Sequence, residues 1–393
     1  MSDAYIVSAV RTPVARAFKG AFRNYRPDDL LADALKAALA EVPSLDPARV
    51  EDVIVGCAMP EAEQGMNVAR IGALLAGLPD NVPGVTVNRF CSSGLQTIAM
   101  AADRIRLGEA DVMIAAGTET MTMVPMMGHK VAMNPKVFSD DNVAIAYGMG
   151  ITAEKVATKW GVSREDQDQF AYRSHQKAIA AIDGGEFTEI RPVTVTHRMP
   201  DPRSGQIREV QQVVDTDEGP RRDTNPETLA KLRTVFDAKG SVTAATSSQM
   251  SDGAGAVIMV SERVLKELNL EPLAVFRGFS VAGVPAEVMG IGPIEAIPKV
   301  LKQTGIAKDD LDWIELNEAF AAQALAVMRT VELDPDKVNP LGGAIALGHP
   351  LGATGAILAA KLIHGLQRRQ QRYGMVTMCI GTGMGAAGIF ERV

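Results

Sequence analysis

Four residues combine a reactive or polar side chain with a position at the end of a predicted element. Cys91, in VNRFCSSGLQT, follows an apolar run and precedes the first turn of a predicted helix. A thiol at a helix amino terminus faces unpaired N–H groups, which stabilise the thiolate, so we expect a lowered pKa for Cys91. A buried, inert cysteine fits the same position, because free cysteine packs as a small hydrophobe.

His349, Cys379 and Asn317 are the other three candidates. His349 lies in ALGHPLGATG, a stiff turn before a helix, where a histidine can be structural or catalytic. Cys379 ends an apolar strand before a glycine-rich turn, and functional groups collect at the carboxyl ends of strands in α/β sheets. Asn317 stands where a strand passes into a helix, so a helix N-cap explains it equally well.

Other signals are weaker. Cys57 lies inside the strand-like VIVGCAMP and is interpreted as structural. Residues 383–388 match GxGxxG, but the chain ends five residues later, so no dinucleotide-binding unit can follow. The chain has no CxxC motif and no Cys/His cluster, so we expect neither a disulfide framework nor a metal site.

Composition narrows the class of protein. A chain of 393 residues is too long for a single compact core, and 47% of its residues are hydrophobic, so it can bury a large interior. A net charge of −7 argues against nucleic acid or an anionic membrane as the main partner. Residues 338–360 and 373–390 carry no formal charge, yet their glycines and prolines fit buried strands and turns better than membrane spans. The three dispersed cysteines and the absence of a signal-like start predict a reducing compartment, the cytoplasm.

The elements that must position these residues alternate between strands and helices. Strands are predicted at 4–13, where Pro13 ends the first, and at 52–60, 84–90 and 111–119, with helices between them, which indicates an α/β fold on a mainly parallel sheet. After residue 120 the pattern changes to a methionine-rich irregular stretch, a polar amphipathic helix and a charged, loop-like region at 197–226. The carboxy-terminal third then repeats the order of the first, which predicts two similar halves with an insertion in the first.

Taken together, NRFCSSG, NEAFAAQ, GGAIALGHPLG and CIGTG resemble the thiolase family, in order and over essentially the whole chain. The resemblance implies the thiolase fold: two similar βαβαβαββ halves form a five-layered α-β-α-β-α core, with an inserted loop domain. The amino-terminal half would be residues 1–120, completed by about 250–270. The loop domain would be 121–249 and bind coenzyme A (CoA), and the carboxy-terminal half would be 271–393.

The resemblance also implies roles for the candidate residues. Cys91 matches the nucleophile that becomes acylated, and His349 the base that activates it. Cys379 matches a second acid/base, which moves a proton on or off the α-carbon of acetyl-CoA. Asn317 matches the residue that holds a water in one oxyanion hole together with His349, and the N–H groups of Cys91 and Gly381 match the other hole.

Substrate contacts follow from the same resemblance. Ser248 matches a serine facing the pantetheine of CoA, and Arg221 a residue near its nucleotide end. CoA would be a co-substrate, with no permanently bound cofactor and no metal. The implied ligands are 3-ketoacyl-CoA, CoA and acetyl-CoA, and the implied assembly is a homodimer or homotetramer. A complex with other β-oxidation enzymes stays open.

The implied activity is acyl transfer: CoA-dependent thiolytic cleavage of 3-ketoacyl-CoA to acetyl-CoA and a shortened acyl-CoA, through an acyl-cysteine, in fatty-acid β-oxidation. GCAMPEAEQGMNVARIG and TSSQMSDGAG resemble the degradative members. Gly148 stands where short-chain biosynthetic members usually carry histidine, which predicts room for a longer acyl chain.

Three alternatives stay open. An acetyl-CoA C-acetyltransferase that makes acetoacetyl-CoA would use the same machinery in a narrower pocket. A ketoacyl synthase shares the fold but lacks a second reactive cysteine, so Cys379 argues against it. A non-catalytic acyl-CoA-binding relative would not need four intact catalytic positions. The sequence determines neither acyl-chain preference, nor the direction of the reaction, nor dimer against tetramer.

Overall fold

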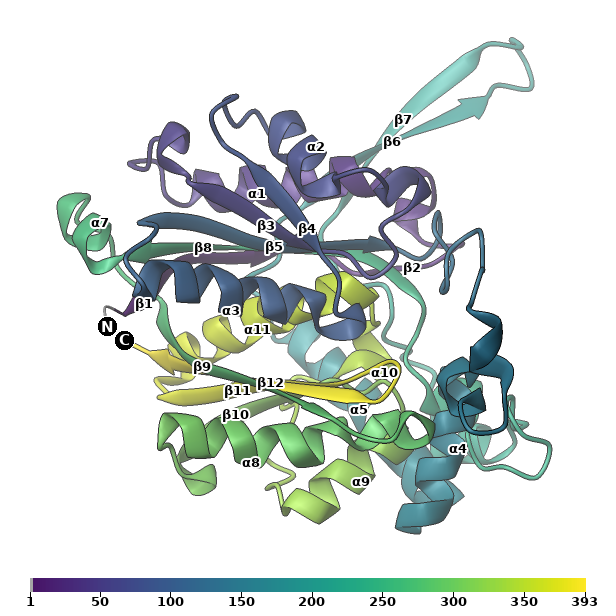
Figure 1. Ribbon diagram of the computed structural model, residues 1–393. Coiled ribbons are helices and arrows are strands. Elements are labelled where there is room, and N and C mark those ends of the chain that lie inside the picture. Colours follow the sequence, from purple (N-terminus) through teal and green to yellow (C-terminus); the bar gives the residue numbers. More distant parts are fainter. Residues whose placement is uncertain (1–2) are drawn as a thin grey trace.

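Two copies of one strand pattern form the core of the computed structural model, which describes residues 3–393 (Figure 1). The strands of the first copy lie in the order β4-β3-β5-β8-β1, and those of the second in the order β10-β11-β12-β9. The bounds in the first copy are β1 (Ala4–Arg11), β3 (Asp52–Gly56), β4 (Gly84–Val87), β5 (Val112–Thr120) and β8 (Ser251–Ser261). Those in the second are β9 (Ala274–Gly283), β10 (Leu311–Leu316), β11 (Tyr373–Ile380) and β12 (Met384–Arg392).

The two copies also agree in strand direction. In the first, β3 is parallel to β4 and β5, whereas β8 is antiparallel to β5 and β1. In the second, β10 and β11 are parallel, and β12 is antiparallel to β11 and β9. A parallel bridge between Ile314 and Val338 takes the place of β4. The halves join where Tyr5 and Ile6 of β1 pair with β9. The predicted internal repeat is therefore present as a repeat of topology.

Helices complete five layers, as the sequence resemblance implied (Figure 1). Two helices cover the outer face of the first sheet: α1 (Pro27–Ala40) and α2 (Val68–Leu75). Two more lie between the sheets: α3 (Ser93–Arg106) and α11 (Thr354–Arg369). Two cover the outer face of the second sheet: α8 (Gly292–Thr304) and α9 (Ala321–Val331). Short elements are β2 (Ala15–Arg16), α7 (Glu262–Glu267) and α10 (Ala344–Leu347).

The two central helices begin side by side, and their glycines make this close approach feasible. A Cβ atom on Gly355 would lie 2.1 Å from the backbone nitrogen of Leu95, and one on Gly94 would lie 2.7 Å from that of Ala356. Real Cβ contacts are never this short, so both positions require glycine. The amino termini of α3 and α11 are thereby held together, which brings Cys91 and His349 to the same place.

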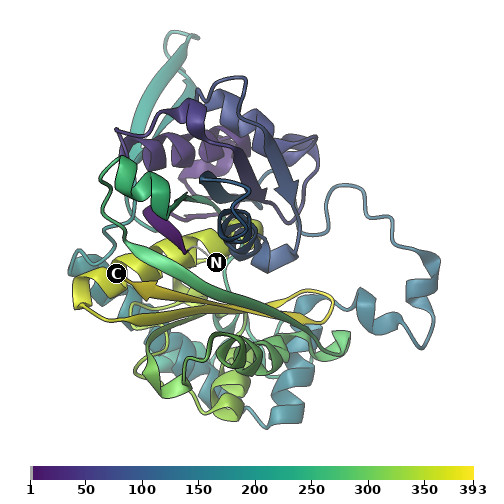
Figure 2. The ribbon, with the colours of Figure 1, turned by 60° about the vertical axis from the view of Figure 1, so that its left-hand side comes forward.

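Residues between β5 and β8 form the insertion. They contain α4 (Met149–Trp160), α5 (Arg164–Asp183), a two-stranded sheet of β6 (Val193–Pro200) and β7 (Ile207–Val214), and α6 (Pro226–Ala230). The methionine-rich stretch before α4 is irregular, as predicted, and extends away from the core in Figure 2.

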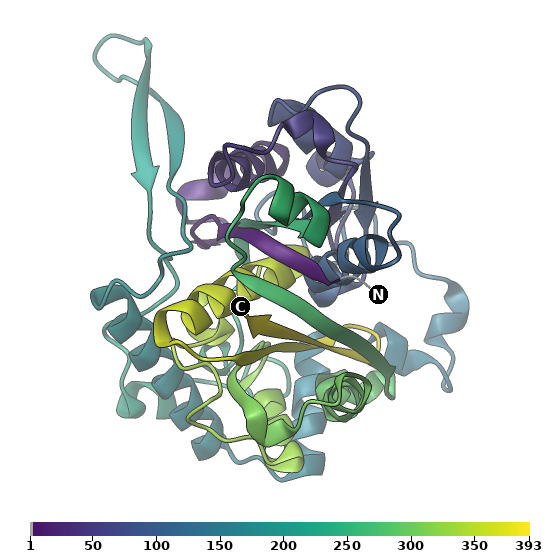
Figure 3. The same ribbon diagram turned by 90° about the vertical axis from the view of Figure 1, so that its left-hand side faces the viewer.

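The prediction of a charged loop at 197–226 is wrong for its first half. Residues 193–214 form the β6–β7 hairpin, which projects from the body (Figure 3). Its strands pair with each other, which satisfies their backbone groups, while only valines near its base are buried. Beyond these valines the strands have no buried face, so residues 197–213 lack the apolar alternation that signals a strand. Within residues 3–393, no helix combines the length and hydropathy needed to traverse a bilayer.

Candidate active site

Cys91 lies in the short 3₁₀ helix η4 (Phe90–Ser92), between β4 and α3. Phe90 has a φ of 43°, in the left-handed region that a bulky side chain seldom adopts. Its N–H donates to the Asn88 carboxamide at 2.7 Å, which helps to hold this conformation. The strain lies directly before the thiol, where it turns the chain from strand to helix.

His349 is held on three sides in a turn before α11. Its backbone N–H donates to the carbonyl of Gln249 at 3.1 Å. Its ring Nδ1 lies 2.7 Å from the hydroxyl oxygen of Thr354, and its Nε2 lies 3.3 Å from the carboxamide nitrogen of Asn317. The ring is 5% exposed. The structure thus brings Asn317 and His349 into direct contact, although 32 residues separate them.

Asn317 does not cap a helix. The helix that follows it, α9, begins at Ala321 with Phe320 as its N-cap. Asn317 is instead buried at the end of β10, and its Oδ1 atom has no hydrogen-bond partner among the described residues. The capping interpretation is wrong, and the side chain is free to serve the site.

Cys379 is buried and Cys91 is partly buried, and desolvation reverses the expected pKa of Cys91. Burial raises its pKa to about 11, outweighing the N–H groups of Gly381 and of Cys91 itself, which lie at the sulfur and lower the pKa. Burial, followed by the neighbouring Cys91, raises the pKa of Cys379. Burial lowers the pKa of His349 to about 4. At neutral pH all three side chains are therefore uncharged.

One cavity of about 600 Å³ contains all three reactive groups. Cys91, His349 and Cys379 line it together, and so does Ser248. The structure therefore gathers two sulfurs and one imidazole, which come from opposite halves of the chain, around a single space.

A second cavity of about 450 Å³ meets the first at Cys91. Gly381 lines it, as do Met126 and Met127 of the methionine-rich stretch. Gly148 lines both cavities, and a Cβ atom at this position would meet nothing within 4 Å. The thiol of Cys91 is thus accessible from two spaces with largely apolar walls.

Arg221 lies apart from the sulfurs, in a third cavity of about 200 Å³. This cavity shares Ser247 and Gln249 with the first, so the two are contiguous. His175 lines it as well, and its ring Nδ1 accepts the backbone N–H of Arg221 at 3.2 Å. Ser248 and Arg221 therefore lie along one path that leads outward from Cys91.

Two family models cover nearly the entire chain. The one described as "Thiolase, N-terminal domain" matches residues 4–263, and the one described as "Thiolase, C-terminal domain" matches residues 270–392. The chain belongs to the thiolase family. The family, the α/β thiolase fold and the acyltransferase class predicted from the sequence are confirmed.

Individual relatives of this thiolase match it from end to end. A Bacillus subtilis protein named 3-ketoacyl-CoA thiolase is 52% identical over 394 residues, covering 100% of both chains. The crystal structure of the Bacillus anthracis acetyl-CoA acetyltransferase superposes with a TM-score of 0.90 at 38% identity, covering 100% of this chain and 99% of that one. The crystal structure of human mitochondrial 3-ketoacyl-CoA thiolase superposes with a TM-score of 0.89 at 38% identity, covering 100% of this chain and 99% of that one.

Sequence reasoning missed three polar residues of the thiolase site: Glu119, His175 and Thr354. Glu119 is fully buried and accepts the N–H groups of Ala58 at 2.7 Å and Gly352 at 2.8 Å, so it holds the His349 turn against β5. The sequence feature that could have identified Glu119 is a carboxylate at the carboxyl end of an apolar strand. His175 and Thr354 lie within predicted helices, where their side-chain contacts have no sequence signal.

The described part of the thiolase chain, residues 3–393, contains no group of three or more His, Cys, Asp or Glu side chains arranged to hold a metal ion. The three cysteines are all free thiols.

Proposed function

We propose that this thiolase cleaves 3-ketoacyl-CoA with CoA, releasing acetyl-CoA and an acyl-CoA shortened by two carbons. One observation carries the proposal: Cys91, His349 and Cys379 line the same cavity. Two thiols and one base are what a retro-Claisen reaction through an acyl-enzyme requires. The relatives named 3-ketoacyl-CoA thiolase support the same activity.

The first step forms a bond between Cys91 and the ketone carbon of the substrate. The thiol is protonated at rest, so Nε2 of His349 takes its proton as the sulfur attacks. The ketone oxygen becomes an oxyanion. The N–H groups of Cys91 and Gly381 both lie at the sulfur, so they are placed to donate to an oxygen on the carbon that it attacks.

The second step breaks the carbon–carbon bond and leaves the acyl group on Cys91. The electron pair passes to the acetyl-CoA part as an enolate. His349, now carrying a proton on Nε2, and the adjacent Asn317 are placed to stabilise the thioester oxygen. Cys379 supplies a proton to the α-carbon. Its raised pKa suits this role, because the thiol holds its proton until the enolate forms.

The third step transfers the acyl group from Cys91 to the sulfur of CoA. Before this step the proton on Nε2 of His349 passes to the Cys379 thiolate, so both side chains return to their resting states. His349 then takes the thiol proton of CoA as that sulfur attacks the acyl carbon, and gives it to Cys91 as the Cys91 sulfur leaves. The low pKa of His349 favours release of the proton that it accepts, so the base is regenerated in each half-reaction.

CoA would occupy the path from the thiolase cavity outward. We place pantetheine beside Ser248 and the nucleotide end in the cavity of Arg221, where the guanidinium can pair with a phosphate. His175 adds a donor there: because its Nδ1 accepts the N–H of Arg221, its ring proton lies on Nε2. CoA is consumed as a co-substrate, and the insertion at 121–249 supplies these contacts.

The cellular setting is part of the proposal. Catalysis needs Cys91 and Cys379 as free thiols, which supports a reducing compartment, the cytoplasm. The family resemblance supports a homodimer or homotetramer, and leaves a complex with other β-oxidation enzymes to be tested by co-purification.

A thiolysis assay with purified protein tests the proposal. We expect acetyl-CoA and a shortened acyl-CoA in equal amounts from medium- and long-chain 3-ketoacyl-CoA. Cys379→Ala should reduce carbon–carbon cleavage by about 10²- to 10⁴-fold, while acyl exchange between Cys91 and CoA falls far less, since exchange moves no carbon-bound proton. Equal loss of both reactions would remove the separate role of Cys379.

An acetyl-CoA acetyltransferase is the second candidate, favoured by the structural similarity to the Bacillus anthracis enzyme of that name. The same residues would then serve acetoacetyl-CoA alone. The open space at Gly148 favours longer substrates. A preference for acetoacetyl-CoA over all longer 3-ketoacyl-CoA substrates in the same assay would support the acetyltransferase instead.

A further inference from the structure

We propose that Thr354 is a positioning residue for the reaction. It keeps the proton of the neutral His349 ring on Nδ1, so that the basic lone pair is on Nε2, the nitrogen that takes the proton of Cys91 in the proposed function. The inference rests on the proposed function, in which His349 is the base.

The first support is the contact itself. The Thr354 hydroxyl lies 2.7 Å from Nδ1 of His349, a short distance for a hydrogen bond between nitrogen and oxygen. Thr354 is 1% exposed and is the first residue of α11. The close approach of Gly355 to Leu95 fixes this end of the helix, so the hydroxyl has little freedom to move away.

The second support is the partner of the other ring nitrogen. Asn317 directs its carboxamide nitrogen at Nε2 from 3.3 Å, and an amide nitrogen can only donate. In this arrangement Nε2 accepts, and the single proton of the neutral imidazole is on Nδ1. The Thr354 oxygen accepts a hydrogen bond from this Nδ1–H group. The two contacts are consistent with one tautomer, the one in which Nε2 is basic.

The chemical nature of the partner also matters. When Nε2 takes a proton from Cys91, the ring becomes a cation, and the bond from Nδ1–H to the hydroxyl strengthens. A carboxylate in place of Thr354 would stabilise the cation further and retain the proton. An uncharged hydroxyl leaves the pKa of His349 low, as burial sets it, so the proton is readily passed on.

Substitution by an isosteric residue without a hydroxyl tests the role. In Thr354→Val we expect kcat for thiolysis to fall by about 10- to 100-fold, with KM for both substrates within about threefold of the wild type. Thr354→Ser, which keeps the hydroxyl, should have a kcat within about threefold of the wild-type value. NMR of ¹⁵N-histidine-labelled protein should show Nδ1 of His349 protonated in the wild type, and the proton redistributed between the two nitrogens in the valine variant.

The matched control is Thr97→Val. Thr97 is also fully buried in a central helix, and its hydroxyl donates to the carbonyls of Gly94 and Ala116 rather than to a histidine. We expect this variant to retain kcat and the histidine spectrum. Similar losses of kcat in both valine variants, or an unchanged His349 tautomer in Thr354→Val, would overturn the inference.

His349→Asn separates this inference from the proposed function. If His349→Asn retains thiolysis, His349 is not the base and the proposed function fails at that residue. If His349→Asn is inactive while Thr354→Val keeps full kcat, the base stands and only the role of Thr354 is refuted.

Discussion

At the residue scale, desolvation dominates the state of the reactive groups. Each pKa unit corresponds to about 1.4 kcal/mol, and a helix amino terminus contributes about 0.3–1 kcal/mol, less than one unit. Burial raises the pKa of Cys91 to about 11 despite two N–H donors at the sulfur, and lowers that of His349 to about 4. The site therefore rests as a neutral thiol beside a neutral imidazole.

The pH dependence of thiolysis follows from this neutral pair. The active forms are protonated Cys91 and unprotonated His349, so kcat/KM for 3-ketoacyl-CoA should be nearly constant between about pH 6 and pH 9. Activity should fall on the acid side as His349 gains a proton near its pKa of about 4, and on the alkaline side as Cys91 loses one near about 11. A rate profile at constant ionic strength measures this, and an acid limb centred near pH 7 would contradict it.

Two neighbouring arginines offer a matched test of CoA recognition. Arg221 lines the cavity of about 200 Å³, whereas Arg222 forms an exposed pair with Asp183 at 2.5 Å. We expect Arg221→Ala to raise KM for CoA by about tenfold or more with little change in kcat, because it removes a charged contact made equally in ground and transition states. Arg222→Ala should leave KM unchanged in the same steady-state assay. Equal effects would place the nucleotide elsewhere.

At the scale of elements, the methionine-rich stretch before α4 forms one wall of the two cavities. Met126 and Met127 line both, and Gly148 ends the stretch as the N-cap of α4. Methionine side chains are flexible and fit apolar ligands of different shape. This wall is the element in which we expect acyl-chain preference to be set.

Gly148→His should shift that preference. The new ring would occupy the open space at this position and shorten the cavity in which we propose that the acyl chain lies. We expect the ratio of kcat/KM for medium-chain 3-ketoacyl-CoA to that for acetoacetyl-CoA to fall by about tenfold or more, since each lost methylene contact costs that much. Gly283→His is the control, because a Cβ there also meets nothing within 4 Å and no active-site cavity includes it. An unchanged ratio in Gly148→His would place the acyl chain elsewhere.

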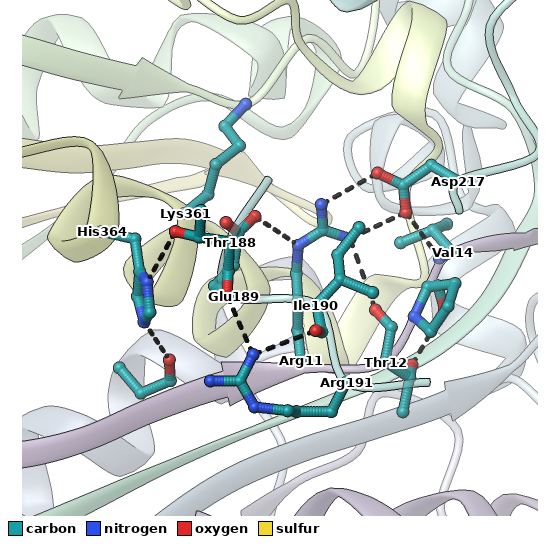
Figure 4. Close-up of polar contacts among 12 residues, drawn as sticks. Arg11, Thr12, Val14, Thr188, Glu189, Ile190, Arg191, Asp217, Lys361 and His364 are labelled. Carbon is teal, nitrogen blue, oxygen red and sulfur yellow. Dashed lines mark hydrogen bonds and ion pairs between the residues drawn. The ribbon is translucent and has the colours of Figure 1, made fainter. Parts of the chain in front are cut away.

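At the scale of the whole molecule, one buried arginine ties the insertion to the core (Figure 4). Arg11, at the end of β1, donates to Glu189 at 2.9 Å and to both oxygens of Asp217 at 2.7 and 2.9 Å. Asp217 also accepts the N–H of Val14 at 2.8 Å. The segment that leads to Arg221 is thereby anchored four residues upstream of that side chain.

Removing the cation should destabilise the fold. Arg11→Met would leave two buried carboxylates without their partner, so we expect the free energy of unfolding to fall by about 3–5 kcal/mol. Urea denaturation followed by circular dichroism measures the change. Arg263→Met is the control, because Arg263 pairs with Asp111 at the surface and its loss should have little effect. Equal stability of the two variants would show that the buried cluster does not anchor the insertion.

Most of the architecture was predictable because it is encoded locally. Apolar periodicity marked β1, α1, α3 and the other core elements. Glycine-rich turns marked the positions of His349 and Cys379, and the junction of an apolar run with a helix start marked Cys91. The motifs around these residues were sufficient to indicate the family. The projecting part of the β6–β7 hairpin was missed because strands without a buried face have no apolar alternation.

The sequence by itself therefore determined the family, the repeated halves and the four loops that carry the candidate catalytic residues. Only the tertiary structure decided the charge state of the site, since desolvation depends on segments distant in the chain. It also decided which neighbours orient His349 and Arg221: Asn317 and His175 reach them across 32 and 46 residues. Such contacts depend on how helices and strands pack, and no local pattern records them.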